Sequence, residues 1–158
     1  MKSWVDPIPC SIRPARPSER KALEDLQRRA SLKSDDYRDA ILANPDAIEL
    51  PAEQIAAGLV IVAEHWGEPV GFAVVLPRED GNAELDGLFV EPDLWGGGIG
   101  RQLVEEAAQF ATALEAVALM VTANPRAVKF YAKCGFQECG ETETRFGPAP
   151  VMARSLVF

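Results

Sequence analysis

A run of glycines between a predicted strand and a predicted helix constrains this chain more than any other feature. The stretch LWGGGIGRQL places four glycines within five positions, at 96–98 and 100. β-Branched and apolar residues precede it, and apolar residues with helical spacing follow it. This order predicts free backbone N–H groups at a helix N-terminus, where glycines leave room for an anion.

Two common phosphate-binding patterns are excluded by the residues around the glycines. A Walker A loop requires a lysine after its last glycine, and none follows here. The dinucleotide fingerprint Gly-x-Gly-x-x-Gly requires a third spaced glycine, but that position holds Arg101 or Leu103. The glycines therefore bind another kind of anion, or they form a flexible turn into the helix.

Bulk properties narrow the classes of function. A chain of 158 residues, 47% of them hydrophobic, is expected to form one domain over residues 1–158. A formal net charge of −8 argues against a nucleic-acid partner, since phosphate contacts need clustered lysine and arginine. No apolar run approaches the ~18 residues of a membrane span, and the N-terminus lacks the apolar segment of a signal peptide. We therefore expect a cytoplasmic protein that does not bind a membrane.

The reactive side chains are few. Three cysteines without a regular framework do not indicate a disulfide scaffold, and Cys134 is expected to be a packed helix residue. His65 is the only histidine, so one chain cannot build a multi-histidine metal site, and we expect no metal. His65 itself is expected at the surface, at the end of a strand. The chemistry should then depend on carboxylates, tyrosine or backbone groups.

Hydrophobic periodicity and turn residues predict a mixed α/β fold. The expected helices cover 18–30 with Ser18 as N-cap, 35–43, a single turn at 51–57, a segment of about 15 residues after the glycines whose apolar face ends at Leu114, and a segment starting at Asn124. The expected strands cover 58–65, 69–77 and 82–90, which should be adjacent and antiparallel, then 115–121, 136–142 and 149–157.

The stretch LFVEPDLWGGGIGRQLVEEA resembles the acetyl-CoA loop of the GNAT (Gcn5-related N-acetyltransferase) superfamily. That family's signature is Arg/Gln-x-x-Gly-x-Gly/Ala, and its backbone N–H groups hold the pyrophosphate of coenzyme A. Gly98 and Gly100 match the two small positions, whereas Trp95 stands where the family has Arg or Gln. Because the loop binds mainly through its backbone, this departure is tolerable. Arg101 either reaches a phosphate or is a solvated surface residue.

The stretch NPRAVKFYAKCGF resembles the next helix of the same family. The resemblance implies that Asn124 bonds the pantetheine arm and that Tyr131 lies near the thioester sulfur as a proton donor. A simple N-cap is the alternative role for Asn124, and a core tyrosine is the alternative for Tyr131. The resemblance is close over residues 83–136 and extends to the rest of the chain only in outline.

The resemblance also implies a GNAT-like fold with a central, mostly antiparallel sheet that splays between its fourth and fifth strands and is flanked by helices. Gly87 is a candidate bulge that would help the splay. Backbone N–H groups at 88–90 would polarise the thioester carbonyl. The predicted cofactor-binding residues are Leu88, Phe89, Val90, Trp95, Gly96, Gly97, Gly98, Ile99, Gly100, Arg101, Asn124 and Tyr131.

Two carboxylates are candidates for the general base. Strand alternation places Glu84 and Asp86 on one face with Leu88 and Val90, and two carboxylates on an otherwise apolar strand suggest a site. Glu84 matches the catalytic glutamate of histone-acetylating family members and is the favoured base. Asp86 would bind the amine or serve as the alternative base. Either carboxylate is otherwise a solvated strand residue.

The resemblance implies an acetyl-CoA-dependent N-acetyltransferase that transfers the acetyl group directly to the primary amine of a small molecule. The alternatives are a longer acyl-CoA, a protein N-terminus or lysine as acceptor, or a non-catalytic acyl-CoA sensor. The acceptor should enter near 28–39 and 141–150, where Asp35, Asp36, Glu141 and Glu143 suggest a cationic molecule or simply a solvated surface. A homodimer is a further expectation.

Overall fold

The structure is a computed structural model that describes residues 7–33 and 38–156. The chain forms two compact units, one comprising residues 1–74 and 87–103 and the other comprising 75–86 and 104–158. The single domain expected over residues 1–158 stays a prediction.

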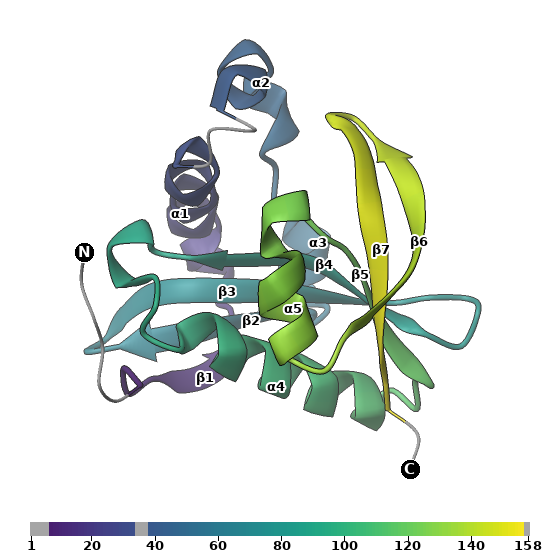
Figure 1. Ribbon diagram of the computed structural model, residues 1–158. Helices are drawn as coiled ribbons and strands as arrows, with labels where there is room; N and C mark the ends of the chain where they lie inside the picture. The colour runs from purple at the N-terminus through teal and green to yellow at the C-terminus, as the bar shows by residue number, and fades with distance from the viewer. Residues whose placement is uncertain (1–6, 34–37, 157–158) are drawn as a thin grey trace. The chain divides into compact units, whose positions relative to one another are not determined.

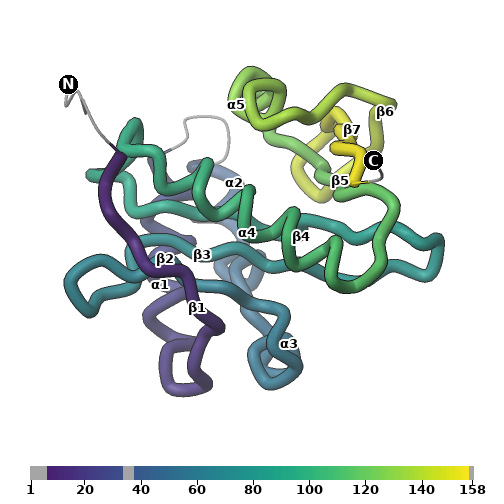
Figure 2. The backbone as a smooth tube through the Cα atoms, turned by 90° about the horizontal axis from the view of Figure 1, so that it is seen from below, coloured from purple at the N-terminus to yellow at the C-terminus, as the bar shows by residue number. Residues whose placement is uncertain are grey.

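The first unit contains antiparallel strands and the N-terminal helices. β1 (Ser11–Pro14) pairs with β2 (Val60–His65), and β2 pairs with β3 (Glu68–Pro77). Figure 2 shows α1 and α3 on the same face of these strands. Leu23 and Leu26 of α1 are buried together with strand residues such as Phe72. The helical elements are η1 (Pro17–Glu19), α1 (Arg20–Leu32), α2 (Arg38–Ala43), η2 (Pro45–Ala47) and α3 (Ala52–Ala56).

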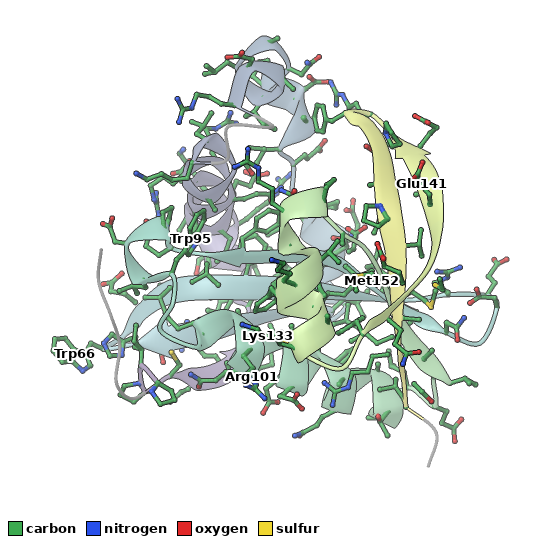
Figure 3. The ribbon with its side chains drawn as sticks, in the orientation of Figure 1. Trp66, Trp95, Arg101, Lys133, Glu141 and Met152 are labelled. Atoms are coloured by element: carbon green, nitrogen blue, oxygen red, sulfur yellow. The ribbon has the colours of Figure 1, made fainter. Side chains whose placement is uncertain are left out.

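The turn between β2 and β3 is a tight two-residue hairpin. Trp66 and Gly67 have φ angles of +51° and +81°, both in the left-handed region that such hairpin turns require. The Trp66 side chain is 91% exposed and projects away from the end of the hairpin (Figure 3). This confirms the hairpin predicted from the strands at 58–65 and 69–77.

The second unit is built on a second antiparallel arrangement. β7 (Gly147–Ser155) pairs with both β5 (Ala118–Thr122) and β6 (Gln137–Thr144), and β6 and β7 form a long hairpin (Figure 1). Between β5 and β6 the chain forms η4 (Pro125–Ala127) and α5 (Val128–Lys133). Met152 in β7 is fully buried.

Three elements run from one unit into the other. The first is β3, which leaves the first unit after Val74. β4 (Ala83–Val90) leaves the second unit after Asp86, and α4 (Ile99–Ala113) leaves the first unit after Leu103; η3 (Pro92–Leu94) lies between these two elements. The pairing of β4 with β5 is parallel and joins only Ala83 with Leu119 and Glu84 with Met120. The two strands are therefore paired only where β4 begins.

The fold class is confirmed. Within the described residues, seven strands are hydrogen-bonded in the order β1-β2-β3-β4-β5-β7-β6. The β4–β5 pair is parallel, whereas the β1–β2, β2–β3, β5–β7 and β6–β7 pairs are antiparallel. This is the mixed, mostly antiparallel α/β sheet that the resemblance implies, and the short parallel pairing of β4 with β5 is consistent with the expected splay between these strands. None of the helices in the described part of the chain is long and apolar enough to cross a membrane.

Several local predictions were wrong at element ends. Ser18 does not cap a helix; a 3-10 turn at Pro17–Glu19 comes first, and the Glu19 carboxylate accepts the Arg16 N–H at 2.8 Å, so α1 begins only at Arg20. The strand β1 was missed, because a short Pro-flanked segment becomes a strand only through its pairing with β2.

The connection after α4 also differs. The helix ends at Ala113, and Leu114 is 42% exposed instead of lying on the buried face. Glu115 has a φ of +64°, which marks a turn, so the following strand begins at Ala118. Leu119 and Val121 of this strand are buried, and the residues between and after them are more exposed. The predicted helix over 35–43 is observed as α2 from Arg38, and Asp35 and Asp36 lie outside the described residues.

Candidate active site

The glycine loop of the first unit connects the end of β4 to α4. Gly96 and Gly98 have φ angles of +89° and +83°, so both adopt a left-handed conformation that other residues enter only with strain. The helix begins immediately afterwards at Ile99. The predicted order of strand, glycine turn and helix is confirmed.

The N-terminus of α4 presents free hydrogen-bond donors. The first helical bond runs from the Gln102 N–H to the Gly98 carbonyl, at 3.1 Å. The N–H groups of Gly98, Ile99, Gly100 and Arg101 have no acceptor among the described residues. These donors stand at the positive end of a helix of 15 residues, where an anion is stabilised by both the N–H groups and the helix dipole.

Trp95 has a structural role at the start of this loop. Its indole N–H donates to the Val90 carbonyl at 2.8 Å, which ties the loop to the last residue of β4, and 48% of the residue is exposed (Figure 3). An indole can therefore occupy this position without contributing a charged side chain. Arg101, on the first turn of α4, is exposed to solvent.

The last residues of β4 are held in place by contacts within the first unit. Phe89 packs on Phe72 with ring centroids 5.3 Å apart, and Leu88 and Val90 are half-buried. Just beyond the strand, the Glu91 carboxylate accepts two hydrogen bonds from the Arg29 guanidinium, at 2.8 and 3.0 Å. Sequence reasoning missed this pair, because nothing in the local pattern links α1 to the loop.

The predicted bulge at Gly87 stays a prediction. A β-carbon at Gly87 would lie 3.0 Å from the Phe89 ring, so the absence of a side chain there makes room for that ring.

The two candidate bases lie in the second unit, at the start of β4. Ala83 and Leu85 are buried, while the alternating residues Glu84 and Asp86 are half-buried and exposed, respectively. The described residues provide no ion pair or hydrogen bond for either carboxylate. Although Asp86 retains solvent contact, partial burial of its carboxyl group raises its pKa above the ordinary value. Glu84 is one of the two residues of β4 that pair with β5, and Asp86 lies just beyond this pairing.

Asn124 caps the helical segment that leads to Tyr131. Its side-chain oxygen accepts the Arg126 N–H at 2.9 Å, and Pro125 occupies the first helical position. This contact uses the amide oxygen and leaves the amide NH₂ group without a partner among the described residues. The N-cap role is therefore confirmed, and the NH₂ group is free to bind a ligand.

Tyr131 is a buried phenol. Its ring makes edge-to-face contacts with Phe130 and Phe136, at centroid distances of 5.1 and 5.4 Å. Burial raises the pKa of Tyr131 well above its usual range, and the neighbouring Cys134 adds a smaller rise. No hydrogen bond to the hydroxyl is found within the described residues. Tyr131 therefore keeps its proton at neutral pH.

The C-terminus of α5 fixes the position of this tyrosine. Gly135 has a φ of +92°, and the Phe136 N–H donates to the Tyr131 carbonyl at 3.0 Å, as in a Schellman cap. Cys134 is buried, as expected of a packed helix-end residue. The predicted helix stop is confirmed.

The predicted site residues are thus distributed over both units. The second unit holds Glu84, Asp86, Asn124 and Tyr131, and the first holds the end of β4 and the glycine loop. Glu141 and Glu143 are exposed on β6. Three groups against the loop were missed: Ile8, Gln102 and the Arg29–Glu91 pair. The sequence places Gln102 in the first turns of the predicted helix, but the contact of Gln102 with Ile8 depends on tertiary structure and could not be predicted from it.

Comparisons with known proteins identify the family. The family model described as Acetyltransferase (GNAT) family matches residues 21–136. The chain is 32% identical over 139 residues to a peptidyl-lysine N-acetyltransferase, YjaB, of Salmonella typhimurium, an alignment that covers 84% of this chain and 87% of that protein.

Solved structures agree with this assignment. The solution structure of apo YjaB from Escherichia coli matches with a TM-score of 0.67 and 28% identity, covering 92% of this chain and 97% of that one. The PaiA N-acetyltransferase of Thermoplasma acidophilum, crystallised with coenzyme A, shares the fold with a TM-score of 0.75 at 18% identity, over 93% of this chain and 99% of that one. The chain therefore belongs to the acetyltransferase (GNAT) family and is an N-acetyltransferase of that type.

Proposed function

We propose that this chain transfers the acetyl group of acetyl-CoA directly to a primary amine. The observation that carries the proposal is the set of four consecutive N–H groups, Gly98 to Arg101, that have no acceptor among the described residues. Free donors at the N-terminus of a long helix are suited to a diphosphate. The complex of the Thermoplasma protein with coenzyme A supports the same ligand class.

The residues of the glycine loop would hold the cofactor through their backbone. Gly96 and Gly98 supply the left-handed turn that exposes the donors, and Trp95 anchors the turn to β4. The backbone at 88–90 would orient the thioester, and the Asn124 NH₂ group would bind the pantetheine arm. When bound, acetyl-CoA supplies an activated acyl group on a thiol leaving group with a pKa of about 8.5.

The carboxylates of β4 would remove a proton from the acceptor. A lysine-like amine has a pKa of about 10.4, so it must lose a proton before its nitrogen can attack. Glu84 or Asp86 would take that proton, directly or through water. The raised pKa of Asp86 brings this carboxyl group closer to neutral pH, which strengthens it as a base.

Tyr131 would protonate the leaving group. The C–N bond forms between the amine nitrogen and the acetyl carbon as the C–S bond breaks, and the phenol hydrogen-bonds to the departing sulfur and gives it a proton. A phenol with an ordinary pKa of about 10 already carries this proton at neutral pH, and the burial that raises the pKa of Tyr131 keeps it protonated.

Two acceptor classes remain for this site. A small cationic amine is compatible with the exposed carboxylates Glu141 and Glu143 on β6. A lysine side chain of a protein is favoured by the name of the Salmonella relative, a peptidyl-lysine N-acetyltransferase, at 32% identity. For the donor, a longer acyl-CoA is the alternative to acetyl-CoA.

A panel of acceptors distinguishes these possibilities. The purified chain is incubated with acetyl-CoA and either polyamines or lysine-containing peptides, and free thiol is measured. Amine-dependent release of thiol supports an enzyme, and the acceptor that reacts fastest identifies the class of substrate. Binding of coenzyme A without thiol release in the presence of any acceptor would favour the acyl-CoA sensor. Replacing acetyl-CoA by longer acyl-CoAs tests the donor. Cytoplasmic location and homodimer formation remain predictions, testable by cell fractionation and by light scattering.

A further inference from the structure

The N-terminal strap, Pro7–Cys10, is bound to the glycine loop of the first unit. The Ile8 N–H donates to the Gly97 carbonyl at 2.8 Å, and the Ile8 carbonyl accepts the side-chain amide of Gln102 at 3.0 Å. Ile8 is only 5% exposed although it lies outside any helix or strand. The next carbonyl of the strap, at Pro9, lies 2.7 Å from Nδ1 of His65.

Gly97 is a glycine for a different reason from its neighbours. Gly96 and Gly98 have positive φ angles, but Gly97 does not. A β-carbon at Gly97 would overlap the Ile8 side chain, with its Cγ1 only 2.7 Å away, and would lie 3.1 Å from the Leu94 carbonyl. The missing side chain at Gly97 therefore makes room for Ile8.

The same contact determines where α4 starts. In a continued helix, the Gly97 carbonyl would accept the Arg101 N–H, four residues later. Here that carbonyl accepts the Ile8 N–H, and the first helical bond is instead the one from Gln102 to Gly98. Among the described residues, the Arg101 N–H consequently has no acceptor, and neither do the three N–H groups before it.

We infer that the N-terminal strap is a positioning element for the diphosphate site, because Ile8 holds the Gly97 carbonyl and thereby sets which N–H groups of α4 stay free. Ile8 and Gln102 act through Gly97 and need not touch the ligand. This inference rests on the proposed function, since it assigns the strap to the coenzyme A site of that proposal.

A double-mutant cycle on Gly97 and Ile8 tests the inference. The variants are Ile8→Ala, Gly97→Ala and the double substitution, with the affinity for coenzyme A measured by calorimetry. Gly97→Ala should weaken binding at least about tenfold, the cost of losing one charge-assisted hydrogen bond. Ile8→Ala removes the atoms that the added methyl group would strike. The double variant should therefore bind coenzyme A no more weakly than Ile8→Ala alone.

Ile55→Ala is the matched control. Ile55, on α3, is also 5% exposed, so its truncation removes the same atoms from an equally buried position away from the loop. It should lower the melting temperature of the unliganded protein about as much as Ile8→Ala does, without changing the affinity for coenzyme A. In steady-state assays, Ile8→Ala should raise KM for acetyl-CoA while leaving kcat and KM for the amine close to wild type.

The outcomes separate this inference from the proposed function. Failure of the wild-type chain to bind coenzyme A would refute the proposed function. If the wild type binds, the strap inference is overturned by any of three results: additive losses in the double variant, which would mean that the methyl group strikes the ligand itself; wild-type affinity in Gly97→Ala; or an equal loss of affinity in Ile55→Ala.

Discussion

At the scale of single residues, the hydroxyl of Tyr131 has no hydrogen-bond partner among the described residues, and its ring lies in a packed aromatic cluster. Phe130 and Phe136 hold the ring, so the hydroxyl contributes little to its packing. The buried hydroxyl group of a tyrosine with only a structural role would be expected to form a hydrogen bond. The free hydroxyl therefore favours a role toward a ligand over the alternative of a satisfied core tyrosine.

Tyr131→Phe should lower kcat by about 10²- to 10⁴-fold, the usual contribution of a positioned proton donor, while the affinity for coenzyme A stays close to wild type. Thiol release and calorimetry measure the two quantities. Because the ring contacts remain, urea unfolding should show an unchanged free energy of unfolding. A variant with full kcat would remove Tyr131 from the mechanism.

The two carboxylates of β4 are distinguished by their pH dependence. If Asp86 is the base, kcat/KM should fall as the pH drops through its raised pKa, and Asp86→Asn should abolish most activity and that acidic limb. If Glu84 is the base, Glu84→Gln should abolish most activity and the fall of kcat/KM in acid. Asp86→Asn should then retain that fall. Full rates in both variants would contradict a carboxylate base on this strand.

The raised pKa of Asp86 also predicts the sign of a stability effect. A carboxyl group whose pKa is higher in the folded state binds its proton more tightly there, so stability falls as the pH rises from the unfolded pKa through the folded one. Asp86→Asn should therefore be at least as stable as wild type at pH 7, and its advantage should shrink in acid. Urea unfolding at pH 4 and pH 7 measures this change; a large loss of stability in Asp86→Asn at pH 7 would show that the carboxylate has a stabilising partner.

At the scale of elements, the first turn of α4 packs closely on β3. A β-carbon at Gly71 would lie 3.0 Å from the Phe89 carbonyl and from Leu103 Cδ1, and 3.3 Å from Ile99 Cγ2. The backbone carbonyl cannot move as a side chain can. Gly71 thus allows the helix that carries the free N–H groups to approach the strand.

Gly71→Ala should lower the free energy of unfolding by about 1–3 kcal/mol, the usual cost of overpacking a core. The matched control is Gly140→Ala in β6, where a β-carbon would meet nothing within 4 Å and φ is not positive. Because alanine reduces the conformational entropy of the unfolded chain relative to glycine, that control should be neutral or slightly stabilising. Denaturant unfolding compares the two, and equal effects would contradict the close packing at Gly71.

The elements that could be predicted from sequence are those fixed by local chemistry. Gly135 and Asn124 mark the ends of the helical segment because caps depend on neighbouring residues, and the turn at Trp66–Gly67 was placed by the flanking β-branched strands. β1 was not predicted, because its strand conformation comes from β2. Ile8 was not predicted as a loop contact, because its packing against Gly97 depends on tertiary structure.

At the scale of the whole molecule, two motifs far apart in the chain were sufficient to predict the family. The glycine loop and the Asn124–Phe136 segment each fit its signature, and the matched family model spans both. The acceptor could not be predicted in the same way, because the residues that would contact it lie outside the motifs. Asp35 and Asp36, two of the expected acceptor residues, also lie outside the described part of the chain.

Binding of coenzyme A should stabilise the whole chain. A ligand that binds only the folded state, present at 100 times its Kd, adds about 2.7 kcal/mol to the free energy of unfolding. A thermal-shift series with coenzyme A should show a concentration-dependent rise in Tm, whereas adenosine, which lacks the diphosphate, should have a much smaller effect. An equal response to both would contradict a site built for the diphosphate.

We propose that the N–H groups at the start of α4, which have no acceptor among the described residues, bind the diphosphate of coenzyme A. This binding can be followed by amide NMR in a titration of the ¹⁵N-labelled chain with coenzyme A. The amide signals of Gly98, Ile99, Gly100 and Arg101 should shift together and saturate with a single Kd. Saturable binding that leaves these four signals in place, with the shifts elsewhere, would contradict it.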